Sequence, residues 1–125
     1  MDRVPYAEED KGVDILVTSE DMRRSVGIQV KTNRGKKAAW ILNKKAEVLA
    51  EDSVFYAFVR LMNGEVPQYH IVPSHVVAEY TTRSHREWLA GVGPSGQPRK
   101  DSSIRKFEDR EERYLDRWDL ILAER

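Results

Sequence analysis

The chain has 125 residues, of which 40% are hydrophobic and 34% are charged, and it contains no cysteine. This composition is typical of a globular domain with a well-solvated surface, and it excludes a disordered chain, a disulfide framework and a thiolate zinc site. No stretch approaches the roughly 18 apolar residues of a membrane span, and the acidic beginning is unlike a secretory signal. We therefore expect a single domain over residues 1–125 that is cytoplasmic and has no membrane partner.

Charge is unevenly distributed along the chain, although the formal net charge is zero. The first 22 residues contain seven acidic and two basic residues, whereas residues 23–45 contain eight basic residues and no acidic one. A basic block of this density can contact the phosphates of a nucleic acid. Charge alone allows a solvated turn region equally well.

The first half of the chain predicts an antiparallel hairpin. Residues 13–19 and 25–33 are apolar and rich in β-branched side chains, and the polar segment between them is short. Residues 38–42 predict either a short strand or the beginning of a helix. Asn43 is the expected N-cap of a helix that continues to about Glu51.

The second half predicts another hairpin, a long helix and a C-terminal element. Residues 54–62 form a nearly continuous apolar run, typical of a central strand buried on both faces, and residues 68–73 follow as its partner. Ser74 is the expected N-cap of a long helix, which ends before the exposed loop predicted at residues 91–103. Residues 110–123 predict a last helix, or a short strand.

Together these elements predict an α/β or α+β domain built on a mixed sheet of about four strands flanked by helices. A short N-terminal segment, residues 1–11, precedes the first strand. We expect the three histidines to lie at the surface or at helix rims, and the three tryptophans to anchor packing rather than stack on bases.

Three polar residues interrupt the apolar strands of the first hairpin: Asp14, Gln29 and Lys31. A loop centred between Asp21 and Met22 would put Asp14 opposite Gln29. Since side chains alternate along a strand, the three polar side chains would then share one face, and the other face would be apolar. The residues alone allow a functional cluster or a half-exposed hairpin with an Asp14–Lys31 ion pair, worth about 0–1 kcal/mol.

As a functional cluster, these residues suit metal-assisted hydrolysis of phosphodiesters. A hard cation such as Mg²⁺ or Mn²⁺ takes oxygen ligands, which the Asp14 carboxylate, the Gln29 amide and the Val30 carbonyl can supply. Lys31 could orient or deprotonate the attacking water, or neutralise charge on the phosphate.

The segment GVDILV, followed after a hairpin by IQVKTN, resembles the Asp…(Glu/Gln)-x-Lys signature of the PD-(D/E)XK nuclease superfamily. In that superfamily the Asp begins one strand, the Glu/Gln and Lys alternate on the next, and a helix leads to an apolar strand. Residues 43–51 and 54–61 match this order. Later blocks, as far as residue 122, resemble a set of small bacterial nuclease-like proteins.

The resemblance implies a restriction-endonuclease-like fold, with Asp14 and Gln29 as metal ligands and Lys31 as the catalytic lysine. Members commonly carry another acidic residue on a preceding helix, whereas only twelve residues precede Val13. Glu9 is our candidate for that role. Otherwise the site would bind metal less tightly, be completed by the second subunit of a homodimer, or be inactive.

We therefore expect a Mg²⁺- or Mn²⁺-dependent nuclease that acts on DNA. The alternative is an inactive nuclease-fold module that binds a nucleic acid or a protein partner in a defence or mobile-element system. The side chains expected to contact the nucleic-acid backbone are Arg23, Arg24, Arg34, Lys36, Lys37 and Lys44.

Overall fold

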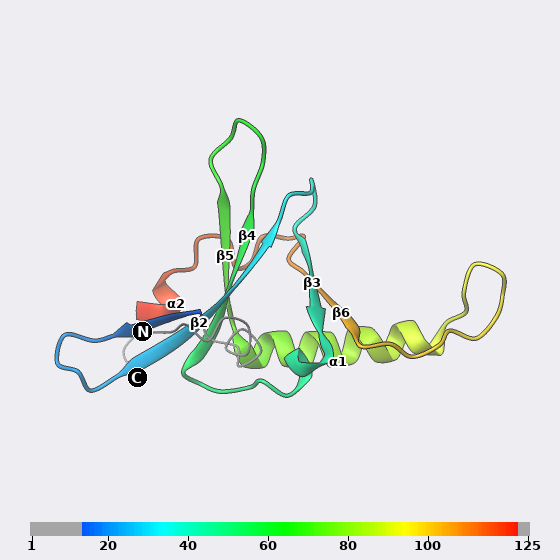
Figure 1. Ribbon diagram of the computed structural model, residues 1–125, viewed down its shortest axis with the longest axis horizontal. Coiled ribbons are helices and arrows are strands. Elements are labelled where there is room, and N and C mark those ends of the chain that lie inside the picture. Colours follow the sequence, from blue (N-terminus) through cyan, green and yellow to red (C-terminus); the bar gives the residue numbers. More distant parts are fainter. Residues whose placement is uncertain (1–13, 123–125) are drawn as a thin grey trace, which may run out of the picture.

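A four-stranded mixed sheet forms the centre of the protein. The computed structural model describes residues 14–122, and the structural statements below concern that part of the chain. The strands lie in the order β1-β2-β4-β5, in which β2 and β4 are parallel and the two outer pairs are antiparallel (Figure 1). Their bounds are Ile15–Thr18 for β1, Ser25–Asn33 for β2, Val54–Arg60 for β4 and Gln68–Pro73 for β5. The predicted mixed sheet of about four strands and its two hairpins are confirmed.

A second, two-stranded antiparallel sheet lies beside the first. It consists of β3 (Ala39–Asn43) and β6 (Ile104–Glu108). The long helix α1 (Ser74–Ala90) packs against β5, β6 and the short 3₁₀ turn η2 (Lys44–Glu47), and its C-terminal half projects from the body with the loop that follows (Figure 1). The architecture is therefore α+β.

Strand β4 is the centre of the core. Its five residues from Phe55 to Val59 are all buried, because the strand has neighbours on both edges and packed layers on both faces. This explains the continuous apolar run in the sequence and confirms the predicted central strand. Burial raises the pKa of the Tyr56 phenol to about 12.

One face of the main sheet packs against the second sheet through aromatic rings. Phe58 stacks on Tyr56 and on Phe107 of β6, with ring centroids 5.1 Å and 4.8 Å away. Trp40 of β3 packs against Phe58 at 5.0 Å, and its indole Nε1 donates a 3.0 Å hydrogen bond to the Val59 carbonyl. Trp40 is thus the packing anchor expected from the sequence.

The opposite face carries a smaller apolar cluster. Its buried members are Ile28, Phe55, Ala57 and Ile71. The short helix α2 (Asp119–Leu122) covers it, contributing Leu120 and Ile121. Both faces of the sheet are therefore covered, which accounts for the buried residues of β2, β4 and β5.

Two helix predictions are corrected. Asn43 does act as an N-cap, since its side chain accepts a 3.0 Å hydrogen bond from the Lys45 N–H, but only one 3₁₀ turn follows. Of residues 110–122 only four are helical, because Glu112 and Asp116 adopt positive φ angles of 57° and 55°, which no continuous helix allows. Strand β6 was not foreseen.

Ser74 does not cap α1 but forms its first residue, with Pro73 in the N-cap position. Its buried hydroxyl donates a 2.7 Å hydrogen bond to the Glu51 carbonyl and accepts a 2.9 Å one from the Glu51 N–H. The residue therefore fixes the segment before β4 onto the helix. Gly91 ends α1, as expected.

His70 lies in the core, contrary to the expectation of a surface histidine. Its Nδ1 is 2.6 Å from Asp109 Oδ2, and both side chains are almost fully buried. The same carboxylate accepts 3.0 Å hydrogen bonds from the N–H groups of Arg113 and Tyr114. One buried carboxylate thus joins β5, the end of β6 and the C-terminal segment.

Replacing Asp109 with Ala should destabilise the protein by about 2–4 kcal/mol, because a buried imidazole and two backbone N–H groups lose their acceptor. Urea denaturation of the purified variants measures the effect. Asp119→Ala, which removes an exposed carboxylate paired with Arg117, is the control and should change stability far less.

The difference in stability between the wild type and Asp109→Ala should depend on pH. Burial alone would raise the pKa of Asp109, but the hydrogen bonds from His70, Tyr114 and Arg113 together hold it below the ordinary value of 3.8. A lowered pKa in the folded state stabilises the protein above about pH 4, and this contribution is lost as the pH falls through the folded-state value. The stability difference should therefore shrink in acid; a constant difference would contradict this account.

Candidate functional site

From Ile15 to Thr18 the first hairpin has the register expected from the sequence, but the pairing does not extend to Asp14, for which the sequence predicted a position opposite Gln29. Ile15 pairs with Ile28, so the two strands are centred on the loop between Asp21 and Met22. Met22 adopts a positive φ of 62°, and the Ser19 N–H donates a 2.8 Å hydrogen bond to the Arg24 carbonyl, which closes the turn. This turn determines which face each side chain of β2 occupies.

Gln29 and Lys31 lie on the face that carries the main aromatic core. In the parallel pairing of β2 with β4, Gln29 is beside Tyr56 and Lys31 is beside Phe58. Both polar side chains are partly exposed, whereas their aromatic neighbours are buried. They therefore lie at the rim of the core.

Asp14 lies one residue outside β1 and contacts the edge of β2. Its N–H donates a 2.9 Å hydrogen bond to the Ile28 carbonyl, and its Oδ2 accepts a 2.7 Å hydrogen bond from the Val30 N–H. Because the N–H and C=O of one extended residue point to the same side of a strand, the Val30 carbonyl lies along this edge as well. The Asp14 carboxylate and the Val30 carbonyl are thus two oxygen atoms on the same edge of β2 that could bind a cation.

The arrangement has the chemical character of a site for a hard cation. Its oxygen ligands at the strand edge are a carboxylate and a backbone carbonyl, and the adjoining residue of β2 is Gln29, which carries an amide oxygen. A carboxylate can accept several hydrogen bonds or ligands, so the bond from Val30 leaves Asp14 able to bind a cation. Asp14 and Lys31 form no ion pair among the described residues, whereas the exposed hairpin of that alternative is present, since all four residues of β1 are exposed.

No acidic cluster completes the site in the described part of the chain. Over residues 14–122, no three histidine or acidic side chains gather in a way that could hold a metal ion. Glu9, the candidate from the sequence, lies outside the described residues.

The basic residues do not form one surface. Arg23 and Arg24 lie in the turn before β2, whereas Arg34, Lys36 and Lys37 lie in the loop after it. Nine residues of extended strand separate the two groups, a distance of roughly 30 Å. Lys44 is in neither group, since it begins η2. The basic residues of the loop after β2 are the ones that follow Lys31 most closely in the chain.

The backbone of this basic loop is held by two side chains that the sequence analysis did not single out for this role. Asn33 Nδ2 donates to the carbonyls of Lys37 (2.9 Å) and Ala39, and its Oδ1 accepts a 2.5 Å hydrogen bond from the Gly35 N–H. Arg60 donates a 2.7 Å hydrogen bond to the Lys36 carbonyl. An Asn just before an Arg-Gly pair is a recognisable turn signal, whereas nothing local marks the role of Arg60.

Asn33→Ala should release the loop, because three backbone groups lose their partner. We expect faster amide exchange at Gly35, measured by hydrogen–deuterium exchange, and a loss of about 1–2 kcal/mol in stability. Thr32→Ala, an exposed position on the other face of the same strand, is the control. Unchanged exchange at Gly35 in Asn33→Ala would show that the side chain does not hold the loop.

No helix over residues 14–122 is both long and apolar enough to cross a membrane. Comparison with known proteins gives no assignment: no protein-family model, no curated protein and no solved structure matches the chain.

Proposed function

We propose that this chain is a metal-dependent nuclease that hydrolyses phosphodiester bonds in DNA. The observation that carries the proposal is the hydrogen bond between the Asp14 carboxylate and the Val30 N–H. It holds an acidic side chain against Val30, which lies between Gln29 and Lys31. The side chains of Gln29 and Lys31 share one face of β2. A carboxylate and a carbonyl at one strand edge, with an amide and an ammonium group on the two flanking residues, form a set suited to phosphoryl chemistry.

Asp14, Gln29 and the Val30 carbonyl would hold a Mg²⁺ or Mn²⁺ ion. When bound, such an ion polarises the phosphate and lowers the pKa of bound water. Lys31 has a separate task, since its ammonium group would orient the attacking water and offset the negative charge that develops on the phosphate. Its partly buried position, beside Phe58 at the rim of the core, restricts the alkyl chain and favours a fixed orientation of the ammonium group.

The loop after β2 would bind the DNA backbone. Arg34, Lys36 and Lys37 are exposed on a loop whose backbone is fixed by Asn33 and Arg60. A fixed backbone with flexible cationic side chains suits contact with phosphates and not with base edges. Binding should therefore depend little on sequence and weaken with salt.

Lys31→Ala should lower the rate of plasmid nicking in Mg²⁺ or Mn²⁺ by about a hundredfold or more, because charge stabilisation at the phosphate is lost. The measurement is the rate of supercoiled DNA loss on gels. Lys45→Ala, which removes an exposed lysine of η2, is the matched control and should leave the rate unchanged. Equal rates for wild type and Lys31→Ala, or no cleavage with any divalent metal, would rule out the enzyme.

The second candidate is an inactive nuclease-fold module that binds a nucleic acid or a protein partner. Its support is that the Asp14 carboxylate already has a structural role at the end of β1, and that Gln29 is neutral. A single charged ligand binds a divalent cation weakly. Completion of the site by a second copy of the chain is the intermediate case, and it would appear as twice the monomer mass in solution.

Metal binding separates the two candidates. Asn at position 14 keeps an oxygen acceptor for the Val30 N–H but loses the negative charge, so Asp14→Asn should weaken Mn²⁺ binding at least tenfold without unfolding the hairpin. Mn²⁺ electron paramagnetic resonance or calorimetry measures the affinity. Asp52→Asn, an exposed aspartate before β4, is the control. Identical affinities for all three proteins would favour the inactive module.

A further inference from the structure

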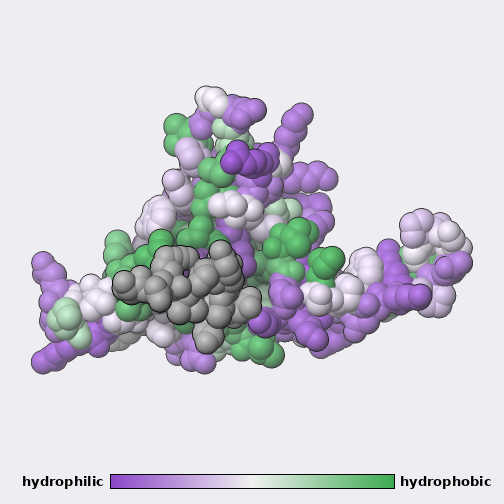
Figure 2. All heavy atoms as spheres, in the orientation of Figure 1, coloured by the Kyte–Doolittle hydropathy of each residue, from purple (hydrophilic) through white to green (hydrophobic). Residues whose placement is uncertain are grey.

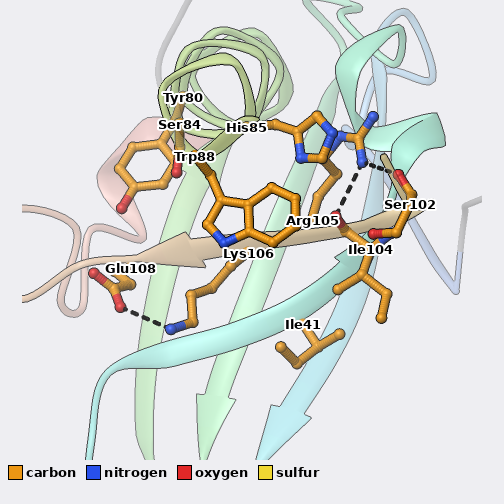
Figure 3. Close-up of a pocket in the computed structure, with 10 residues that line it drawn as sticks. All are labelled: Ile41, Tyr80, Ser84, His85, Trp88, Ser102, Ile104, Arg105, Lys106 and Glu108. Carbon is orange, nitrogen blue, oxygen red and sulfur yellow. Dashed lines mark hydrogen bonds and ion pairs between the residues drawn. The ribbon is translucent and has the colours of Figure 1, made fainter. Parts of the chain in front are cut away.

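A hollow of about 450 Å³ lies between α1 and the outer face of the β3–β6 sheet (Figure 3). This is within the usual size of a small-ligand site. Its main side chains are Ile41, Tyr80, His85, Trp88, Ile104 and Lys106. None of them belongs to the hairpin site, which is built on β1 and β2. We refer to this hollow as the helix groove.

The floor of the helix groove is apolar and exposed. Ile41 and Ile104 are 64% and 59% exposed, because they lie on the outer face of the sheet while their neighbours Trp40 and Leu42 point into the core. Figure 2 shows hydrophobic side chains gathered over β3, with hydrophilic side chains beside them. Exposed apolar area with a polar rim is typical of a binding surface.

Trp88 forms the wall of the groove and is 42% exposed. The His85 ring stacks on it with centroids 5.6 Å apart and planes inclined by 21°. For rings separated by about 3.5 Å, that centroid distance means a lateral offset of about 4 Å, so His85 covers only part of the indole. A 2.8 Å contact with Asp101 holds His85 in place. The Arg99 guanidinium also lies over the ring, so the surface available to a flat ligand is the part of Trp88 that neither side chain covers.

One cation lies over Trp88, and another lies on the floor of the groove. The Arg99 guanidinium lies 5.0 Å from the centroid of the Trp88 ring, and Arg99 Nη1 donates a 2.7 Å hydrogen bond to the Trp88 carbonyl. The Lys106 ammonium group lies within the groove, 3.4 Å from Glu108, which also pairs with Arg110. Over residues 14–122, Lys106 therefore shares its one acidic partner with a second cation, and its ammonium group can receive an added anion.

We propose that the helix groove binds a base and the adjoining phosphate of a single-stranded nucleic acid, an inference that rests on the proposed function for the choice of polyanion. The base would lie against the exposed part of Trp88 and over Ile41 and Ile104, and Lys106 would contact the phosphate. A flat apolar surface beside cations is the combination by which proteins bind unpaired bases without reading sequence. The groove would thus hold an unpaired strand away from the hairpin site.

The test is fluorescence anisotropy of a labelled deoxythymidine decamer, in EDTA so that no cleavage takes place. Trp88→Ala should weaken binding roughly tenfold, since base stacking on an aromatic side chain is lost. Trp118→Ala is the matched control, because Trp118 is equally exposed (41%) but packs on Tyr69 away from the groove. It should bind as the wild type does.

A second pair of variants covers the case in which Trp88→Ala fails to fold. Lys106→Gln should weaken decamer binding and lower its dependence on salt by about one phosphate contact. Arg110→Gln removes the other exposed cation that pairs with Glu108 and should not do so. Equal binding by Lys106→Gln and Arg110→Gln, or no decamer binding by the wild type, overturns the proposal, and a protein partner then becomes the better candidate for the groove.

Decamer binding without plasmid nicking would reject the proposed nuclease activity but support the proposed binding at the groove.

Discussion

The parallel pairing of β2 with β4 is the constraint on which the rest of the structure depends. Parallel neighbours cannot be joined by a tight turn, so the chain between them must leave the sheet and return. Here the connecting residues 34–53 contain β3 and η2, so the second sheet begins inside the crossover. The same pairing sets Gln29 beside Tyr56 and Lys31 beside Phe58, which brings polar side chains to the rim of an aromatic core.

The sequence predicted what depends on neighbouring residues along the chain. The register of the first hairpin follows from its short polar turn, and the burial of β4 follows from an unbroken apolar run. It did not predict β6 or the irregular chain after it, because β6 forms only through pairing with a strand far away in the sequence, and positive φ angles at Glu112 and Asp116 have no strong local signal. The buried state of His70 depends in the same way on a distant partner, Asp109.

For the candidate site, sequence reasoning identified the common face of Gln29 and Lys31, but not how Asp14 is held at the edge of β2. The bond from Val30 to Asp14, and the support of the basic loop by Asn33 and Arg60, depend on the strand edges that meet there. The hairpin site and the helix groove use different elements. A strand of nucleic acid that contacted both would therefore be bound by two surfaces with different chemistry, one charged and one aromatic.

The pairing of β3 with β6 has a consequence for how the chain folds. Ala39 and Glu108 are partners although 69 positions separate them in the sequence. During synthesis, the hairpins and α1 can form from local contacts, whereas Trp40 and Leu42 must wait for Phe107 before their layer is complete. The second sheet is therefore expected to close late, and a partly synthesised chain exposes the aromatic face of β4 until its last quarter has emerged.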